Sequence, residues 1–99
     1  MSLKPLKIYE KLDPKLLKEI ENSFEFTFSE GALPRKTKFL IAMALDASHG
    51  AIPGVKALAS AAKEAGATKD EILEAIRVAQ YISGVGVAYV ASHTLSEIF

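Results

Sequence analysis

Cysteine is absent from this 99-residue sequence. Without it the chain can form no disulfide bond, and it has no thiolate nucleophile and no cysteine ligands for zinc or an iron–sulfur cluster. Functions that depend on thiol chemistry within these residues are therefore excluded.

An excess of charge of either sign is also missing, because 12 Lys and Arg residues balance 12 Asp and Glu residues. Proteins that bind nucleic acid or an anionic membrane surface usually carry an excess of basic groups. The longest apolar run, Phe39–Leu45, is far shorter than the roughly 20 residues of a membrane-spanning helix. Nothing at the start resembles a secretory signal. We therefore expect a cytoplasmic protein that binds neither nucleic acid nor membranes.

The residues that are present are those of a globular protein, with 49% hydrophobic and 24% charged. A chain of this length forms one domain, which we place over residues 1–99. Many of its apolar residues are alanines, and there are more apolar residues than so small a core needs. The surplus predicts an interface between identical subunits.

Helix-starting and helix-ending residues predict an all-α fold of about five helices with no strand. Asp13 and Pro14 form a typical N-cap and first helical residue. Thr68 and Glu71 have the spacing of a capping box. Phe24, Phe26 and Phe28 also fit the period of a strand, but that strand would be very short. We expect helices close to residues 13–30, 34–48, 53–65, 68–82 and 87–99.

Gly66 is a typical residue just beyond a helix end, and it predicts an antiparallel hairpin between the third and fourth helices. The expected core stripe of the third helix is Val55, Leu58, Ala59, Ala62 and Ala65, and that of the fourth is Ile72, Ala75, Ile76 and Ala79.

The helix expected over Thr37–Ser48 is apolar on nearly every face after Lys38. A helix of this kind is buried all round. We expect it to be covered partly by its own chain and partly by another subunit.

Three segments carry a family pattern: Leu33–Ala42 reads LPRKTKFLIA, Ala61–Ala75 reads AAKEAGATKDEILEA, and Tyr81–Ala88 reads YISGVGVA. In this order and spacing they resemble the carboxymuconolactone decarboxylase and alkylhydroperoxidase D-like family. The resemblance places the domain core at residues 33–99 and an N-terminal helical extension at 1–32. It implies an all-helical subunit that assembles as a homo-trimer or homo-hexamer.

The peroxidase branch of that family carries Cys-x-x-Cys and a histidine before its Ala-rich helix, with a glutamate in the preceding helix. The resemblance aligns the two thiols with Ala51 and Gly54, the histidine with Ala57 or Leu58, and the glutamate with Phe39. None of these groups is present, so thiol peroxidase activity is not expected.

The decarboxylase branch needs no thiol, because it acts on small acidic lactones by general acid–base chemistry. Its usual histidine falls near Leu58 and is missing, whereas His93 resembles a second histidine of its last helix. The resemblance implies a decarboxylase-like lyase if the protein is an enzyme.

Asp46 and His49 stand three residues apart at the end of a predicted helix, beside the emptied thiol loop. A carboxylate that orients an imidazole is a common general base. The alternative is that His49 only interacts with the carbonyl end of the helix dipole.

His93 lies on the last predicted helix, where it could line a pocket with Glu64 and Tyr81 or simply be exposed. The spacing of His49, His93 and Asp46 matches no metal motif. We expect no metal and no cofactor.

The candidate catalytic residues are thus His49, Asp46 and His93. The helix that starts near Pro53 has free N–H groups that favour an anion. We expect any ligand to be a small carboxylate held there, with His49 or His93 as the base.

Three functions remain to be compared. The first is acid–base chemistry on, or binding of, a small organic acid or lactone. The second is a non-catalytic oligomeric binding or scaffold protein. The third, a peroxiredoxin-type oxidoreductase, is contradicted by the missing cysteines.

Overall fold

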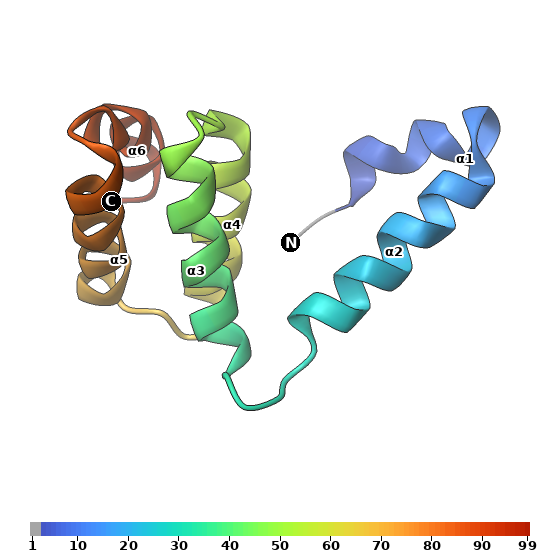
Figure 1. Ribbon diagram of the computed structural model, residues 1–99, viewed down its shortest axis with the longest axis horizontal. Coiled ribbons are helices and arrows are strands. Elements are labelled where there is room, and N and C mark those ends of the chain that lie inside the picture. Colours follow the sequence, from blue (N-terminus) through green and yellow to red (C-terminus); the bar gives the residue numbers. More distant parts are fainter. Residues whose placement is uncertain (1–2) are drawn as a thin grey trace.

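The computed structural model describes residues 3–99, and within them every regular element is a helix, as predicted (Figure 1). Five long helices follow two short N-terminal ones. The elements are η1 (Lys4–Ile8), α1 (Tyr9–Leu12), α2 (Pro14–Phe28), α3 (Arg35–Ser48), α4 (Ile52–Glu64), α5 (Lys69–Ser83) and α6 (Gly86–Ile98). None of the helices in this part of the chain has the length and hydropathy that crossing a membrane requires.

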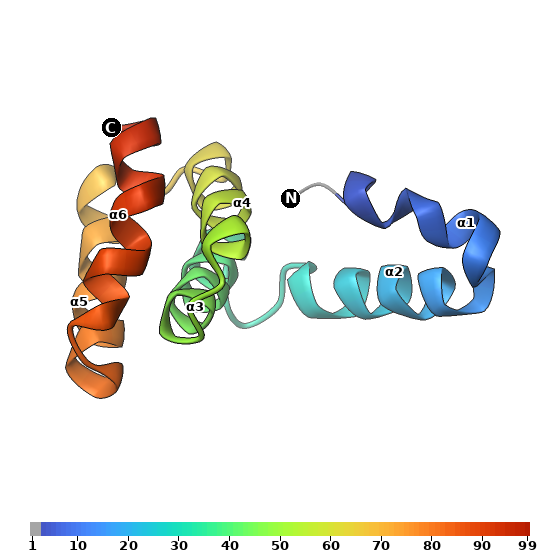
Figure 2. The same cartoon turned by 90° about the horizontal axis from the view of Figure 1, so that it is seen from above.

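Helices α3 to α6 form a bundle, and η1, α1 and α2 form an arm that extends away from it (Figures 1 and 2). We call residues 4–28 the arm. In the bundle, α3 and α4 are an antiparallel pair and α5 and α6 are another, packed through α3 on α5 and α4 on α6. The arm meets the bundle only near the end of α2.

The tightest hairpin in the structure is formed by α3 and α4. The sequence had indicated a hairpin about Gly66, between α4 and α5, but α4 packs mainly against α3 and touches α5 at few residues. The connections explain the difference. Three residues, His49–Ala51, join α3 to α4 and hold them together, with Gly50 at a positive φ of 75°. The connection after α4 instead crosses the bundle to reach α5 (Figure 1).

Gly66 ends α4 as predicted, at φ 101°. Its N–H donates to the carbonyl of Lys63 at 3.0 Å, and the N–H of Ala67 donates to the carbonyl of Ala62 at 2.8 Å. These two bonds are the Schellman arrangement, which satisfies carbonyls that the helix end would leave unpaired.

The predicted capping box at the start of α5 is confirmed. The N–H of Glu71 donates to Thr68 Oγ1 at 3.1 Å, and the N–H of Thr68 donates to Glu71 Oε1 at 2.8 Å. Lys36 Nζ lies 2.9 Å from Glu71 Oε2 and links α3 to α5. The Thr68 backbone N–H, and after it the Lys36 ammonium, lower the pKa of Glu71 below its ordinary value of 4.5.

The core lies entirely in the bundle and is rich in alanine, which lets the helices approach closely. Two expectations change at its edge: Ala65 is exposed because it caps α4, and Ala75 is only half-buried. Helix α2 contributes no buried residue. The buried apolar residues are Phe39, Met43, Ala47, Val55, Leu58, Ala59, Ala61, Ala62, Ala67, Ile72, Ile76, Ala79, Val87 and Ala91.

Helix α3 is covered on one side only within the chain. Phe39, Met43 and Ala47 are buried, whereas Ile41 is 46% exposed and Leu45 is 56% exposed. The side that carries Ile41 and Leu45 is an apolar face on the surface of the single chain.

Candidate functional site

His49 lies on the wall of an open groove of about 460 Å³ between α3 and α5. The short turn after α3 places it there, because His49 is the residue that caps the helix. The groove is lined by Ile41, Ala44, Leu45, Ser48, His49, Val78, Ala79, Ile82 and Ser83.

The polar side chains of the groove gather at one end of it. Ser48 and His49 come from the end of α3, and Ser83 is the last residue of α5. The Ser48 hydroxyl donates to the carbonyl of Ala44 at 3.0 Å. The His49 imidazole makes no hydrogen bond to any residue in the part of the chain that the structure describes. The groove thus offers an apolar wall with one titratable group, which suits a small and mostly apolar molecule with a polar end.

The Asp46 carboxylate lies against the first turn of α4 and not in the groove. A β-carbon on Gly54 would come within 2.8 Å of Asp46 Cγ. The His49 backbone N–H donates to the Asp46 carbonyl at 3.1 Å. Within residues 3–99 no hydrogen bond joins the two side chains, so the carboxylate does not orient the imidazole. A negative charge beside the start of a helix is favourable, and α4 has no side-chain cap of its own. The place that the sequence assigned to a bound carboxylate therefore has the chain's own carboxylate beside it.

His93 is exposed on α6 and does not line the groove. Tyr81 is exposed as well, and Glu64 lines a separate cleft of about 270 Å³ with Arg35 and Phe39. The structure does not bring His93, Glu64 and Tyr81 into one cavity. Across residues 3–99, no group of three or more His, Cys, Asp or Glu side chains is arranged to hold a metal ion.

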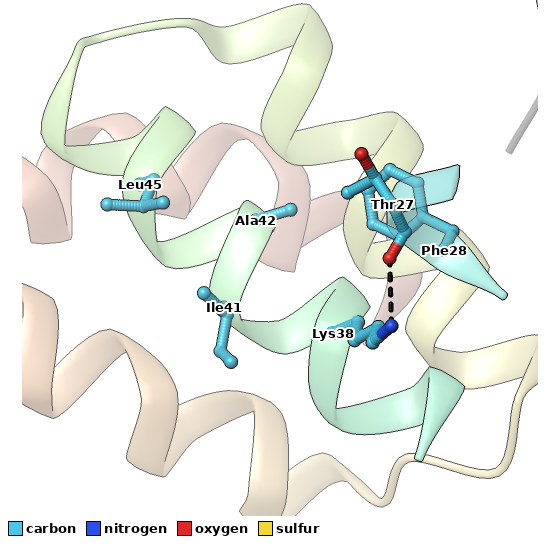
Figure 3. A pocket seen from close by; sticks show the side chains of 6 residues that line it. All are labelled: Thr27, Phe28, Lys38, Ile41, Ala42 and Leu45. Carbon is cyan, nitrogen blue, oxygen red and sulfur yellow. Dashed lines mark hydrogen bonds between the residues drawn. The ribbon is translucent and has the colours of Figure 1, made fainter. Parts of the chain in front are cut away.

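A second hollow, of about 290 Å³, lies where the arm meets α3 (Figure 3). Lys38 Nζ donates to the carbonyls of Thr27 at 3.0 Å and Ser29 at 2.7 Å, at the end of α2. The Phe28 ring stacks on Phe39 with a centroid distance of 4.9 Å. Ile41 and Leu45 line both this hollow and the His49 groove, so the two form one continuous apolar surface.

The α5 wall of the groove was not predicted from the sequence. Val78 and Ile82 are four residues apart and lie outside the core stripe of α5, so they form a second apolar stripe on that helix. Ile41 and Leu45 repeat this spacing on α3. Two uncovered stripes on helices that pack together are the signal that could have revealed the groove.

The comparisons with known proteins agree with the architecture. The sequence profile of the carboxymuconolactone decarboxylase family matches residues 14–97, from the first residue of α2 almost to the end of α6. The crystal structure of an apo carboxymuconolactone decarboxylase family protein from Legionella pneumophila superposes with a TM-score of 0.87 at 28% identity, over 94% of this chain and 83% of that one. The comparison with curated proteins gave no match. The chain belongs to the carboxymuconolactone decarboxylase family.

Proposed function

We propose that this chain is the subunit of a homo-oligomer, a trimer or hexamer, that binds a small, largely apolar organic acid or lactone in the groove between α3 and α5. His49 is the acid–base group of the site, and any turnover is decarboxylase-like. The observation that carries the proposal is the imidazole of His49 on the wall of a groove that is apolar except at the end where Ser48 and Ser83 also lie.

The chemistry available in the groove is proton transfer. Histidine exchanges protons near neutral pH, and the hydroxyl groups of Ser48 and Ser83 lie at the same end of the groove. A ligand that places its apolar part against Val78 and Ile82 would present its polar end to His49. The Asp46 carboxylate contacts Gly54 and stabilises the turn between α3 and α4. His93 lies outside the groove and is a second candidate base only for a ligand bound elsewhere.

A non-catalytic scaffold is the second candidate. It is supported by the walls of the groove, which are apolar except at one end, and by the apolar residues exposed on α3 and α5. Surfaces of this kind usually mark an interface or a ligand groove.

A titration distinguishes the two functions. Small carboxylates and lactones of increasing apolar size, such as acetate, benzoate and γ-butyrolactone, are added to the protein and followed by calorimetry and by NMR of the two histidine rings. We expect the larger probes to bind and to shift the His49 resonances, with His49→Ala weakening binding about tenfold or more, the effect of losing one charge-assisted hydrogen bond.

His93→Ala is the matched control, because it removes the other exposed imidazole, which lies outside the groove, and we expect it to bind like the wild type. Absence of binding by every probe, with both variants behaving like the wild type, would leave the scaffold function. Peroxide reduction with a dithiol donor should be undetectable, since these residues hold no thiol.

A further inference from the structure

The arm has an apolar surface that its own chain leaves uncovered. No residue of η1, α1 or α2 is buried. Ile8, Leu12 and Leu16, one each from η1, α1 and α2, are exposed, and Phe26 of α2 is 87% exposed. Helices gain most of their stability from packing an apolar face, so an arm of this kind needs a surface to pack on.

Only the end of α2 packs on the bundle of its own chain, where Thr27 and Phe28 share a hollow with Ile41 and Leu45. Lys38 and the stacked rings of Phe28 and Phe39 fix the end of α2 to α3, and from there α2 runs away from the bundle in both views, with η1 turning back from α1 (Figures 1 and 2). The exposed residues of the arm are therefore left uncovered by the bundle of the same chain.

The bundle carries a matching uncovered surface along the His49 groove. The groove rim is formed by Ile41, Leu45, Val78 and Ile82, of which Ile82 is 76% exposed. A small ligand could fill the groove but could not cover this rim. We call these four residues the groove rim.

The size of the uncovered surface fits association between copies. The chain exposes 6636 Å², whereas a folded monomer of its mass is expected to expose about 5,500 Å². The excess, roughly 1,100 Å², exceeds the ~800 Å² that each partner contributes to a standard interface. The radius of gyration of 14.2 Å is likewise above the ~13 Å expected for a chain of this length.

We infer that the arm of one copy packs on the groove rim of a second copy and closes the His49 groove. The binding site is then completed by the partner, and a subunit in isolation has an open site. Because each copy has a net charge of zero, two copies do not repel each other through their overall charge. The inference rests on the proposed homo-oligomer and specifies which surfaces form it.

The cysteine-free sequence allows a direct test by disulfide cross-linking. One copy carries Leu16→Cys or Phe26→Cys in the arm, and the other carries Leu45→Cys or Ile82→Cys at the groove rim. The two single-cysteine proteins are mixed, exchanged under mild denaturant, returned to native buffer and oxidised. Because each copy has one thiol, every disulfide must join two copies. We expect the mixture of an arm variant with a groove-rim variant to give a dimer band, the heterodimer, that neither variant gives when it is oxidised alone.

Lys69→Cys, on the exposed first residue of α5, is the matched control and should form no heterodimer with the arm variants. Two positions on each surface keep the test decisive if one variant fails to fold. A wild-type oligomer without any arm-to-rim disulfide would overturn the inference and leave the proposed function standing. So would efficient cross-linking of Leu45→Cys only to itself, because two grooves would then cover each other. A wild-type monomer would overturn both the inference and the proposed oligomer.

Discussion

Gly66 shows at the scale of one residue how local chemistry sets the fold. Its φ of 101° lies in a region that residues with a side chain rarely adopt. A β-carbon there would meet no atom within 4 Å, so the requirement for glycine comes from the backbone and not from lack of space. Gly54 has the opposite character, because a neighbouring carboxylate fills the space that its β-carbon would need.

Gly66→Val should lower the free energy of unfolding by about 1–2 kcal/mol, since a β-branched residue resists the left-handed conformation. Gly31→Ala is the matched control: it also has open space, but its φ is not positive, so its effect should be close to zero or slightly stabilising. Denaturant unfolding of both variants measures the difference. Equal midpoints for Gly66→Val and the wild type would contradict the assigned cap.

The buried hydroxyl group of Thr94 gives a second prediction for a single residue. Thr94 is 1% exposed on α6, and its hydroxyl has no hydrogen-bond partner among the described residues. Thr94→Val keeps the shape and removes the unsatisfied group, so it should raise the free energy of unfolding by about 1 kcal/mol. Thr94→Ser keeps the hydroxyl and loses a packed methyl group, so it should be destabilising. A valine variant less stable than the wild type would show that the hydroxyl does have a partner.

At the scale of the elements, the Asp46 carboxylate lies against Gly54 in the first turn of α4, and Glu71 closes the capping box of α5 and pairs with Lys36. Both contacts lie where one helix meets the beginning of another, where free N–H groups favour a negative charge.

Gly54→Ala should destabilise the chain by roughly 1–3 kcal/mol, because the new methyl group overlaps the Asp46 carboxylate. In an Asp46→Ala background the same substitution should become neutral or stabilising by up to ~1 kcal/mol, since alanine favours a helix more than glycine does. A double-mutant cycle by chemical denaturation measures the coupling. Additive effects of the two substitutions would refute the contact.

The capping box gives a pH dependence whose sign follows from Glu71. Its pKa is lowered in the folded state, so its stabilisation is complete above the unfolded value of 4.5 and is lost as the pH falls through the lower folded value. Glu71→Gln should therefore differ in stability from the wild type at pH 7, and the difference should narrow below pH 4.5. Unfolding curves at pH 7 and pH 3 test this. A difference that is the same at both pH values would count against stabilisation by the ionised Glu71 carboxylate, which bonds to the Thr68 N–H and pairs with Lys36.

At the scale of the whole molecule, sequence reasoning predicted the helices better than their partners. Capping chemistry is local, so Asp13, Gly66 and the Thr68–Glu71 pair could be identified from spacing alone. The pairing of α3 with α4 depends on how far each connection must reach, and no local pattern contains that distance. Two further features could not be predicted without knowing how the helices pack. They are the position of Asp46 beside the α4 N-terminus and the groove wall formed by Val78 and Ile82.

The prediction that α3 is buried on every face rests on its apolar composition. The single chain covers only the face that carries Phe39, Met43 and Ala47. The arm, the groove rim and the excess surface all lead to the same expectation, which is that the remaining apolar surface is covered by other copies of the chain.

The mass of the particle in solution is the most direct measurement of this expectation. Light scattering coupled to size exclusion, at micromolar concentration, should give three or six times the 10.7 kDa of one chain. A Leu45→Glu variant, which places a charge on the groove rim, should shift the mass toward smaller species, because burying an unpaired charge is costly. A wild-type mass of 10.7 kDa under these conditions would contradict the account.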